Sequence, residues 1–305
     1  MTGSVLELWV VVSFAAACFQ TLRFMLQKAL SVKELSPAGA TFARFCYSAP
    51  LIVLVMGVYA NAHGHAFQAP SFAFWAFAAT GALAQVLATV AVVTLFKLRN
   101  FAVGVTLMKT EVILSVVLGF VLLGDGIGIW AFIAILIGVL GVLLLSPAPE
   151  TSHLGWRTLW NRSIALGLGA GFLFAISGVC YRGASLEIGS DDPILRAGLT
   201  LAAVTSMQMV GMWLWLQWRD NAQIGAVWRA RRRAVWIGIT SLASSFCWFF
   251  AFTLQAAAYV KAVGQVELVL SLIASLLFFG EKVSAREFWG MAVLCASILM
   301  LVLLT

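Results

Sequence analysis

The sequence predicts an all-α integral membrane protein with ten transmembrane helices, arranged as two inverted repeats of five helices each. Three observations support this prediction. Of the 305 residues, 62% are hydrophobic and 10% are charged, whereas a soluble domain carries roughly 25% charged residues. Apolar runs long enough to span a bilayer recur along the whole chain, and part of the first half is repeated in the second half. This composition excludes an ordinary soluble enzyme, a disordered protein and a nucleic-acid binder.

Ten apolar segments, bounded by charged residues, glycine or proline, define the expected helices. A spanning helix needs about 20 apolar residues, and the segments are 4–27, 37–59, 71–96, 101–123, 128–146, 163–185, 194–217, 235–256, 260–280 and 284–304. No Lys or Arg precedes Arg23, so we expect the first segment to be a retained helix and not a cleaved signal peptide. We interpret the polar residues 147–161 as a linker between a first repeat at 1–146 and a second repeat at 162–305.

The internal repeat emerges when the sequence is shifted by 156 positions. Five pairs of identical or similar residues then align: Glu111 with Glu267, Ser115 with Ser271, Leu122 with Phe278, and Gly124-Asp125 with Gly280-Glu281. Because each half has an odd number of helices, the second half enters the bilayer upside down relative to the first. Inverted repeats of this kind are typical of transporters, whose substrate sites lie near the bilayer midplane.

The repeated strings also resemble a known family. Glu111-Val-Ile-Leu-Ser115 with the later Gly124-Asp125, together with its copy in the second half, is similar to the EamA-like domain of the drug/metabolite transporter superfamily. Arg44 resembles the arginine on the second helix of that family. Val112 and Leu268 replace the proline that often follows the glutamate, and Asp125 stands where the family usually has Glu. The resemblance implies a ten-helix, two-repeat transporter with a central cavity, and it does not name a substrate.

We therefore expect a secondary transporter that exports a small metabolite, such as an amino acid or a related amphipathic compound, by alternating access. A vitamin, a drug or a lipid-linked cargo is the alternative, with a non-transporting membrane protein as a further one. No Walker motif is present, so a proton or substrate gradient would supply the energy, and we expect no cofactor. We do not expect an enzyme, because no histidine lies within a predicted span.

The expected partners are a small-molecule substrate and the lipid bilayer, with no nucleic acid. A monomer would suffice, because both repeats lie in one chain, and a dimer stays open. The expected location is the inner (plasma) membrane of a bacterium. His63 and His65 have no third candidate ligand nearby in the sequence, so no metal site is expected.

Two glutamates at mid-depth of predicted helices are the first site candidates. A charge at the bilayer centre costs at least ~2.5–3.5 kcal/mol, so such a residue normally faces a cavity or a partner. Glu111 and Glu267 could line the cavity as a pseudo-symmetric pair, binding an amino group or exchanging protons. Alternatively, each glutamate braces a neighbouring helix and stays protonated.

Lys109 lies two residues before Glu111, which is about 200° around an α-helix, so the two side chains are not expected to pair. Lys109 binds either a carboxylate of the substrate or Glu267 across the repeat axis. Its repeat position is occupied by Gln265, which is also polar.

Further binding candidates share a polar or aromatic side chain within a predicted span: Gln20, Gln85, Arg44, Trp248 and Tyr259. Arg44 would reach either a substrate carboxylate or an acidic residue in a loop. Arg23 either lines the cavity or extends its guanidinium to the membrane interface.

Two arguments about orientation disagree. With both termini outside, the cytoplasmic loops would hold 13 Lys and Arg residues and the opposite loops three, namely Arg182, Arg196 and Lys261. The positive-inside rule favours that orientation. Resemblance to the EamA-like family suggests the reverse, so orientation stays open at this point.

Overall fold

A computed structural model describes residues 3–64, 70–98, 108–145, 162–279 and 285–304, and within these ranges the protein is helical and has no strand. The predicted linker 147–161, the Gly280-Glu281 pair and His65 lie outside the described residues. The helices are α1 (Gly3–Lys33), α2 (Pro37–Ala62), α3 (Phe72–Leu98), the 3-10 turn η1 (Met108–Thr110), α5 (Glu111–Leu123), α6 (Ile129–Leu145), α7 (Arg162–Leu186), α8 (Pro193–Arg219), α9 (Ala222–Arg229), α10 (Arg231–Leu254), α11 (Ala257–Val263), α12 (Val266–Phe279) and α13 (Ala285–Leu304).

The described residues contain six helices that are long and apolar enough to cross a membrane: α1, α2, α3, α7, α8 and α10. The apolar helices α6 and α13 are shorter, as are α5 and α12. The prediction of an all-α membrane protein is therefore confirmed, whereas the count of ten spans is not. Each expected segment nevertheless overlaps a helix, because long apolar runs are stable in a bilayer only when their backbone hydrogen bonds are satisfied internally.

The starts of α2 and α8 show how local sequence sets helix boundaries. Ser36 accepts a hydrogen bond from the Gly39 amide (3.0 Å), and Asp192 accepts one from the Ile194 amide (2.9 Å). A proline follows each capping residue at the first helical position, where its missing N–H leaves no donor unsatisfied. Both starts obey the same offset of 156 residues as the glutamates.

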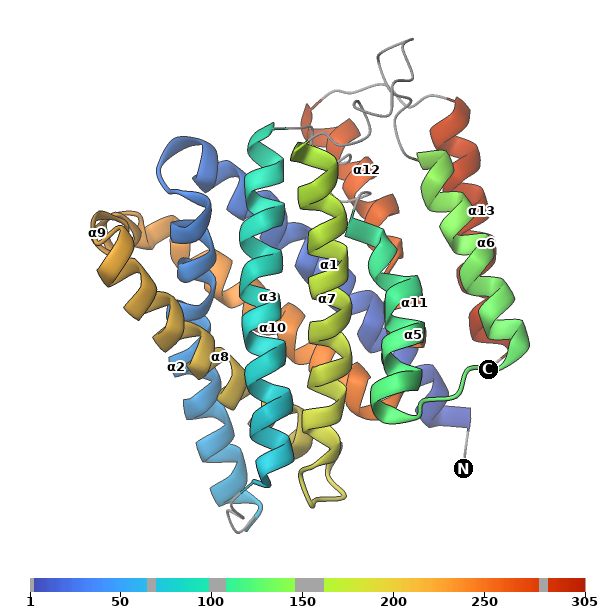
Figure 1. The fold of residues 1–305 in the computed structure, drawn as a ribbon, viewed down its shortest axis with the longest axis horizontal. Coiled ribbons are helices and arrows are strands. Elements are labelled where there is room, and N and C mark those ends of the chain that lie inside the picture. Colours follow the sequence, from blue (N-terminus) through green and yellow to red (C-terminus); the bar gives the residue numbers. More distant parts are fainter. Residues whose placement is uncertain (1–2, 65–69, 99–107, 146–161, 280–284, 305) are drawn as a thin grey trace.

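The two halves pack against each other reciprocally. The first helix of one half contacts the third helix of the other, as α1 does with α10 and α3 with α7. In the same way α2 contacts α8, and α6 lies along α13 at one edge of the molecule (Figure 1). The helices α1 and α7 also enter from opposite ends (Figure 1). This reciprocity favours the expected inverted relation between the halves, which stays a prediction.

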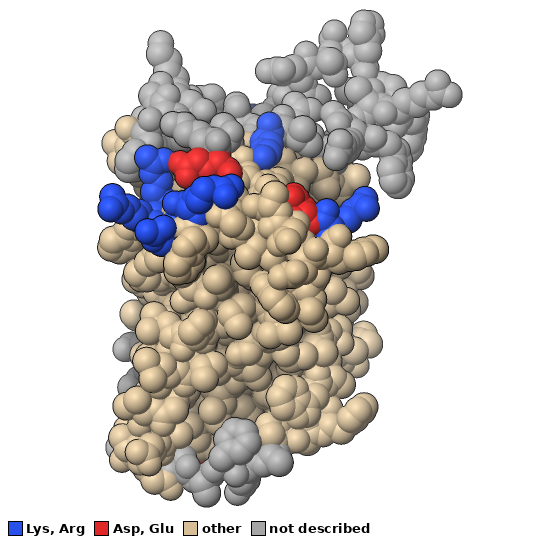
Figure 2. Space-filling view, turned by 90° about the vertical axis from the view of Figure 1, so that its left-hand side faces the viewer, with Lys and Arg blue, Asp and Glu red and all other residues tan. Residues whose placement is uncertain are grey.

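The charged surface is confined to one end of the side formed by α2, α8 and α9. Figure 2 shows Lys and Arg gathered there above a broad band without charged residues. The exposed arginines of this region are Arg219, Arg229, Arg231, Arg232 and Arg233. The band below exposes large apolar side chains, such as Leu54 and Val58 of α2, as a surface facing lipid tails would. The chain is thus an integral membrane protein.

Candidate functional site

Two irregular points of the described chain, the 3-10 turn η1 and the break between α11 and α12, determine where the site lies. The turn η1 precedes α5, and α11 ends at Val263 before α12 begins at Val266. The expectation of one continuous helix over 260–280 is therefore wrong, because the chain breaks at Gly264 and Gln265. The η1 turn and the break between α11 and α12 lie at equivalent positions of the two halves, 156 residues apart. Discontinuous helices at membrane depth are typical of transporter binding sites.

Glycines let both breaks lie close to neighbouring helices. A Cβ on Gly264 would overlap the ring of Trp248, and a Cβ on Gly171 of α7 would overlap Thr110 and the carbonyl of Met108. The chain therefore passes nearer to the α10 ring and to η1 than a side chain would allow. Gly264 is the residue in the sequence that marks the position of this break.

Both predicted glutamates lie in the first turn of a half-helix, Glu111 in α5 and Glu267 in α12. Both are buried, with exposed fractions of 3% and 0%. The amino end of a helix presents unpaired backbone N–H groups and a partial positive charge, which stabilise an adjacent carboxylate. The starts of α5 and α12 are therefore two buried positions at which a negative charge is tolerated.

The two glutamates form ion pairs that cross between the halves. Lys109 Nζ lies 2.6 Å from Glu267 Oε2, and Lys261 Nζ lies 2.9 Å from Glu111 Oε2. The expected link between Lys109 and Glu267 is thus present. Both pairs are buried, and removing one partner of a buried pair costs about 3–5 kcal/mol because the other charge is left uncompensated. The pairs hold the two halves together at this depth.

Two expectations about the lysines are wrong. Lys109 Nζ also lies 3.6 Å from Glu111 Oε1, because Lys109 belongs to a 3-10 turn and not to the α-helix assumed for it. Lys261 was counted among loop residues, yet it lies in α11 with 7% of its surface exposed. Its position six residues before Glu267 in an apolar stretch was the signal that sequence reasoning missed.

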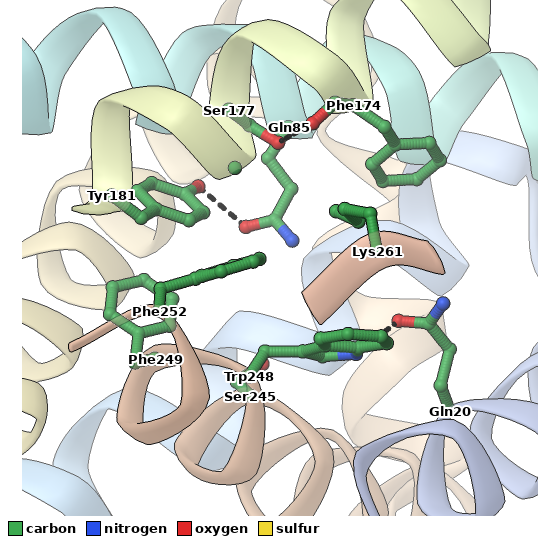
Figure 3. A pocket seen from close by; sticks show the side chains of 11 residues that line it. Gln20, Gln85, Phe174, Ser177, Tyr181, Ser245, Trp248, Phe249, Phe252 and Lys261 are labelled. Carbon is green, nitrogen blue, oxygen red and sulfur yellow. Dashed lines mark hydrogen bonds between the residues drawn. The ribbon is translucent and has the colours of Figure 1, made fainter. Parts of the chain in front are cut away.

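A small cavity adjoins the Lys261–Glu111 pair. It is lined by Gln20, Gln85, Phe174, Ser177, Gly178, Tyr181, Ser245, Trp248, Phe249, Phe252 and Lys261 (Figure 3). Its volume of about 20 Å³ is room for a single water, since one water needs roughly 10–15 Å³ by the same measure. The sequence candidates Gln20, Gln85 and Trp248 are therefore brought together here. Phe249 was expected, with Trp248, to be able to stack a planar substrate, whereas the aromatic walls at Phe174 and Phe252 were not anticipated.

Gln20 joins the cavity to the carboxylates. Its amide donates to Glu267 Oε2 (3.0 Å) and its carbonyl accepts from the Trp248 indole (2.9 Å). The Lys261 ammonium lies over the Trp248 ring at 5.1 Å from the centroid, and over Phe174 and Phe252 at 5.7 and 5.8 Å. Aromatic faces attract cations at such distances. The cavity therefore already holds one ammonium of the chain itself.

A second hydrogen-bond network closes the other side of the cavity (Figure 3). The Tyr181 hydroxyl donates to Gln85 Oε1 (2.5 Å) and accepts from the Gln208 amide (3.1 Å). This network links α3, α7 and α8, and neither Gln208 nor its role was anticipated from the sequence.

Other candidates lie apart from the cavity. Tyr259 is buried against Trp9, and its hydroxyl accepts from the Gly128 amide (3.3 Å). The side chain of Gln265 is buried beside Gly138 of α6. The serine that follows each glutamate by four residues hydrogen-bonds backbone carbonyls and not the carboxylate, as Ser115 does with Glu111 O (2.7 Å).

Two arginines lie behind the cavity wall. Arg44 donates to Ser241 (2.8 Å), Thr89 (3.2 Å) and Ser245 (3.1 Å), so the expected pairing with a loop acid is not found among the described residues. Arg23 has 1% of its surface exposed and lies over the Phe24 ring at 4.3 Å. The expectation that Arg23 extends to the interface is therefore wrong.

A further ion pair lies near the end of α7. Arg182 binds Asp125 through two parallel hydrogen bonds (2.8 and 3.1 Å) and also donates to the Phe252 carbonyl (2.9 Å). Arg182 is thus half-buried and not the free loop residue assumed in the count of charges. This fork joins the α5–α6 connection to α7 and α10.

Fold and site together define a polytopic helical membrane protein whose buried ion pairs connect two halves beside a small cavity. Residues 161–303 match the model of the EamA-like transporter family. One crystal structure superposes with a TM-score of 0.69 over 97% of this chain and 96% of that chain, at 13% identity, which shows a common fold. No curated protein matches the chain.

Proposed function

We propose that this membrane protein is a secondary transporter that exports a small amphipathic metabolite, such as an amino acid, by alternating access. The observation that carries the proposal is the pair of buried carboxylates, each bound to a lysine from the other half, beside a small cavity. The transporter family matched by residues 161–303 supports the same class of function.

The size of the cavity sets a requirement on the mechanism. A space of about 20 Å³ does not accommodate a metabolite, so a transporter must widen this cavity before cargo can bind there. Opening would separate elements of the two halves, and the crossed pairs Lys109–Glu267 and Lys261–Glu111 join those halves. A substrate group or a proton that replaces one partner compensates the charge left behind, which links binding to opening.

The charge distribution favours a cytoplasmic position for the basic end. The loops at that end include the exposed arginines of α8–α10, and positive loops remain on the cytoplasmic side. Lys261 and Arg182 are held in ion pairs with Glu111 and Asp125, so they no longer count among the free loop charges of the opposite end. The difference in positive charge between the two ends is therefore larger than the sequence count. We therefore propose that both termini face away from the cytoplasm.

The test is release of labelled amino acids and other metabolites from proteoliposomes, with and without a pH gradient. Release of one substrate class supports the transporter, and acceleration by the gradient supports proton coupling. In a coupled transporter, Glu111→Gln and Glu267→Gln should abolish gradient-driven release and leave exchange intact. Wild-type dependence on the gradient in both variants would exclude that role, and absence of release of every compound, vitamins and drugs included, would contradict the proposal.

A further inference from the structure

The buried charges of the described residues do not balance. Six Arg, Lys or Glu side chains of the described residues are buried, of which four are basic and two are acidic: Arg23, Arg44, Lys109, Lys261, Glu111 and Glu267. The two lysines are paired with the two glutamates. Neither arginine has a carboxylate within 4.0 Å among the described residues, although the Glu267 carboxylate attracts Arg23 from a longer distance.

Arg23 is the less satisfied of the two arginines. Its Nε and Nη1 atoms are buried and have no hydrogen-bond partner in the described part of the chain. Burying a charged group without a partner is costly, and such a group is rarely kept within a membrane span unless it has a function. In the described part of the chain Arg44 donates only to neutral hydroxyls, which do not compensate its charge.

Neither arginine lines the cavity, but each is related to a residue that does. Arg23 follows Gln20 by one turn of α1, and Gln20 lines the cavity. Arg44 donates to Ser245, which lines the cavity as well. A shift of Ser245 would therefore bring the Arg44 guanidinium to the cavity, and Arg23 lies three residues after Gln20 on the same helix. The remaining wall is largely aromatic, with Trp248 and Phe249 among its members (Figure 3).

We infer that the cargo is an organic anion whose carboxylate or phosphate binds Arg23 and Arg44, while its apolar body packs against the aromatic wall. This inference rests on the proposed transport function and specifies its substrate class. The planar guanidinium binds carboxylate and phosphate groups through two parallel hydrogen bonds. An entering anion supplies the close countercharge that Arg23 lacks among the described residues.

Binding to the purified protein in lipid nanodiscs tests the charge of the cargo with four compounds that share one aromatic body. Phenylacetate and phenyl phosphate carry an anion, phenethylamine carries a cation, and phenylalanine carries both charges. We expect phenylacetate or phenyl phosphate to bind and to raise the melting temperature, and the comparison of the two distinguishes carboxylate from phosphate. Phenethylamine should not bind, because its ammonium would approach two uncompensated guanidinium groups.

Variants of Arg23 separate a binding role from a structural one. Arg23→Gln should lower the affinity for the anion by about 30-fold or more, which is the usual effect of removing one partner of a buried charge pair. It should also raise the melting temperature of the ligand-free protein, because an uncompensated buried charge is removed. Arg23→Lys, which keeps the charge and loses the fork, should retain part of the affinity. Arg232→Gln, at an exposed position, should change neither quantity.

The inference is overturned if neither anion binds, if phenethylamine binds as tightly as the anions, or if Arg23→Gln binds anions as well as the wild type. A lower melting temperature for ligand-free Arg23→Gln would also contradict it, since that result identifies Arg23 as a structural residue. Failure of the proposed transport function has a different signature, namely anion binding in nanodiscs without flux of any compound in proteoliposomes.

Discussion

Removing Lys109 should destabilise the protein far more than removing a surface charge. In Lys109→Gln, the carboxylate of Glu267 stays fully buried and loses the ammonium at 2.6 Å. Its remaining donor is Gln20, at 3.0 Å, and its Oε1 atom already has no partner among the described residues. Breaking a buried pair in this way costs about 3–5 kcal/mol.

That cost is large against a total stability of about 5–15 kcal/mol. At about 2 °C per kcal/mol, the lower end of the usual range for long chains, the melting temperature should fall by roughly 6–10 °C. The double variant Lys109→Gln/Glu267→Gln removes both charges and should recover most of the loss. The coupling free energy between the two positions should be at least about 1.5 kcal/mol.

Tryptophan fluorescence during thermal unfolding in detergent measures these effects. The matched control is Glu34→Gln, which breaks the exposed pair of Glu34 with Arg233, whose side chains are 34% and 69% exposed. Exposed pairs contribute about 0–1 kcal/mol, so this variant should melt close to the wild type. The reasoning fails if Lys109→Gln also melts within about 2 °C of the wild type, or if the double variant is as unstable as the sum of the single ones.

Two further predictions concern packing and the fork at the end of α7. Gly141→Ala places a Cβ 2.9 Å from the backbone nitrogen of Leu294. It should therefore separate α6 from α13 and lower the free energy of unfolding by about 1–3 kcal/mol. Gly57→Ala, whose added Cβ would have nothing within 4 Å, is the control in the same melting assay. A Gly141→Ala protein as stable as Gly57→Ala would show that the two helices do not meet here. Arg182→Lys keeps the charge but loses the two-point contact with Asp125, so it should melt below the wild type and not be rescued by higher salt. Unchanged melting would contradict a structural role for the fork.

The helices were largely predictable because a bilayer demands long apolar runs. The start of α8 at Pro193 lies within a residue of the predicted 194–217 segment. Predicting helices from apolar runs fails where a helix includes polar residues. The helix α1 continues to Lys33, beyond the expected end at residue 27, and the short helix α9 was not anticipated. The break between α11 and α12 was also missed, since Gly264 alone does not distinguish a break from a packing site in a helix.

The site was predictable only as far as the internal repeat reaches. The offset of 156 residues identified Glu111, Glu267 and Lys109, and the shortage of acids inside the membrane indicated the pair of Lys109 with Glu267. Lys261 has an apolar residue, Val105, at the equivalent position, so the repeat gave no reason to place it in the core. Its contact with Glu111 depends on how α11 approaches α5 in space, which no local pattern encodes.

Alternating access is the central claim, and the accessibility of the cavity from each side of the membrane tests it most directly. Ser177 lines the cavity and is buried, so Ser177→Cys in a background without other cysteines reports on opening. The account predicts that a membrane-impermeant thiol reagent labels this cysteine from either side of a proteoliposome, and that a transported cargo shifts the ratio of the two rates. Labelling from one side alone, with or without cargo, would contradict alternating access.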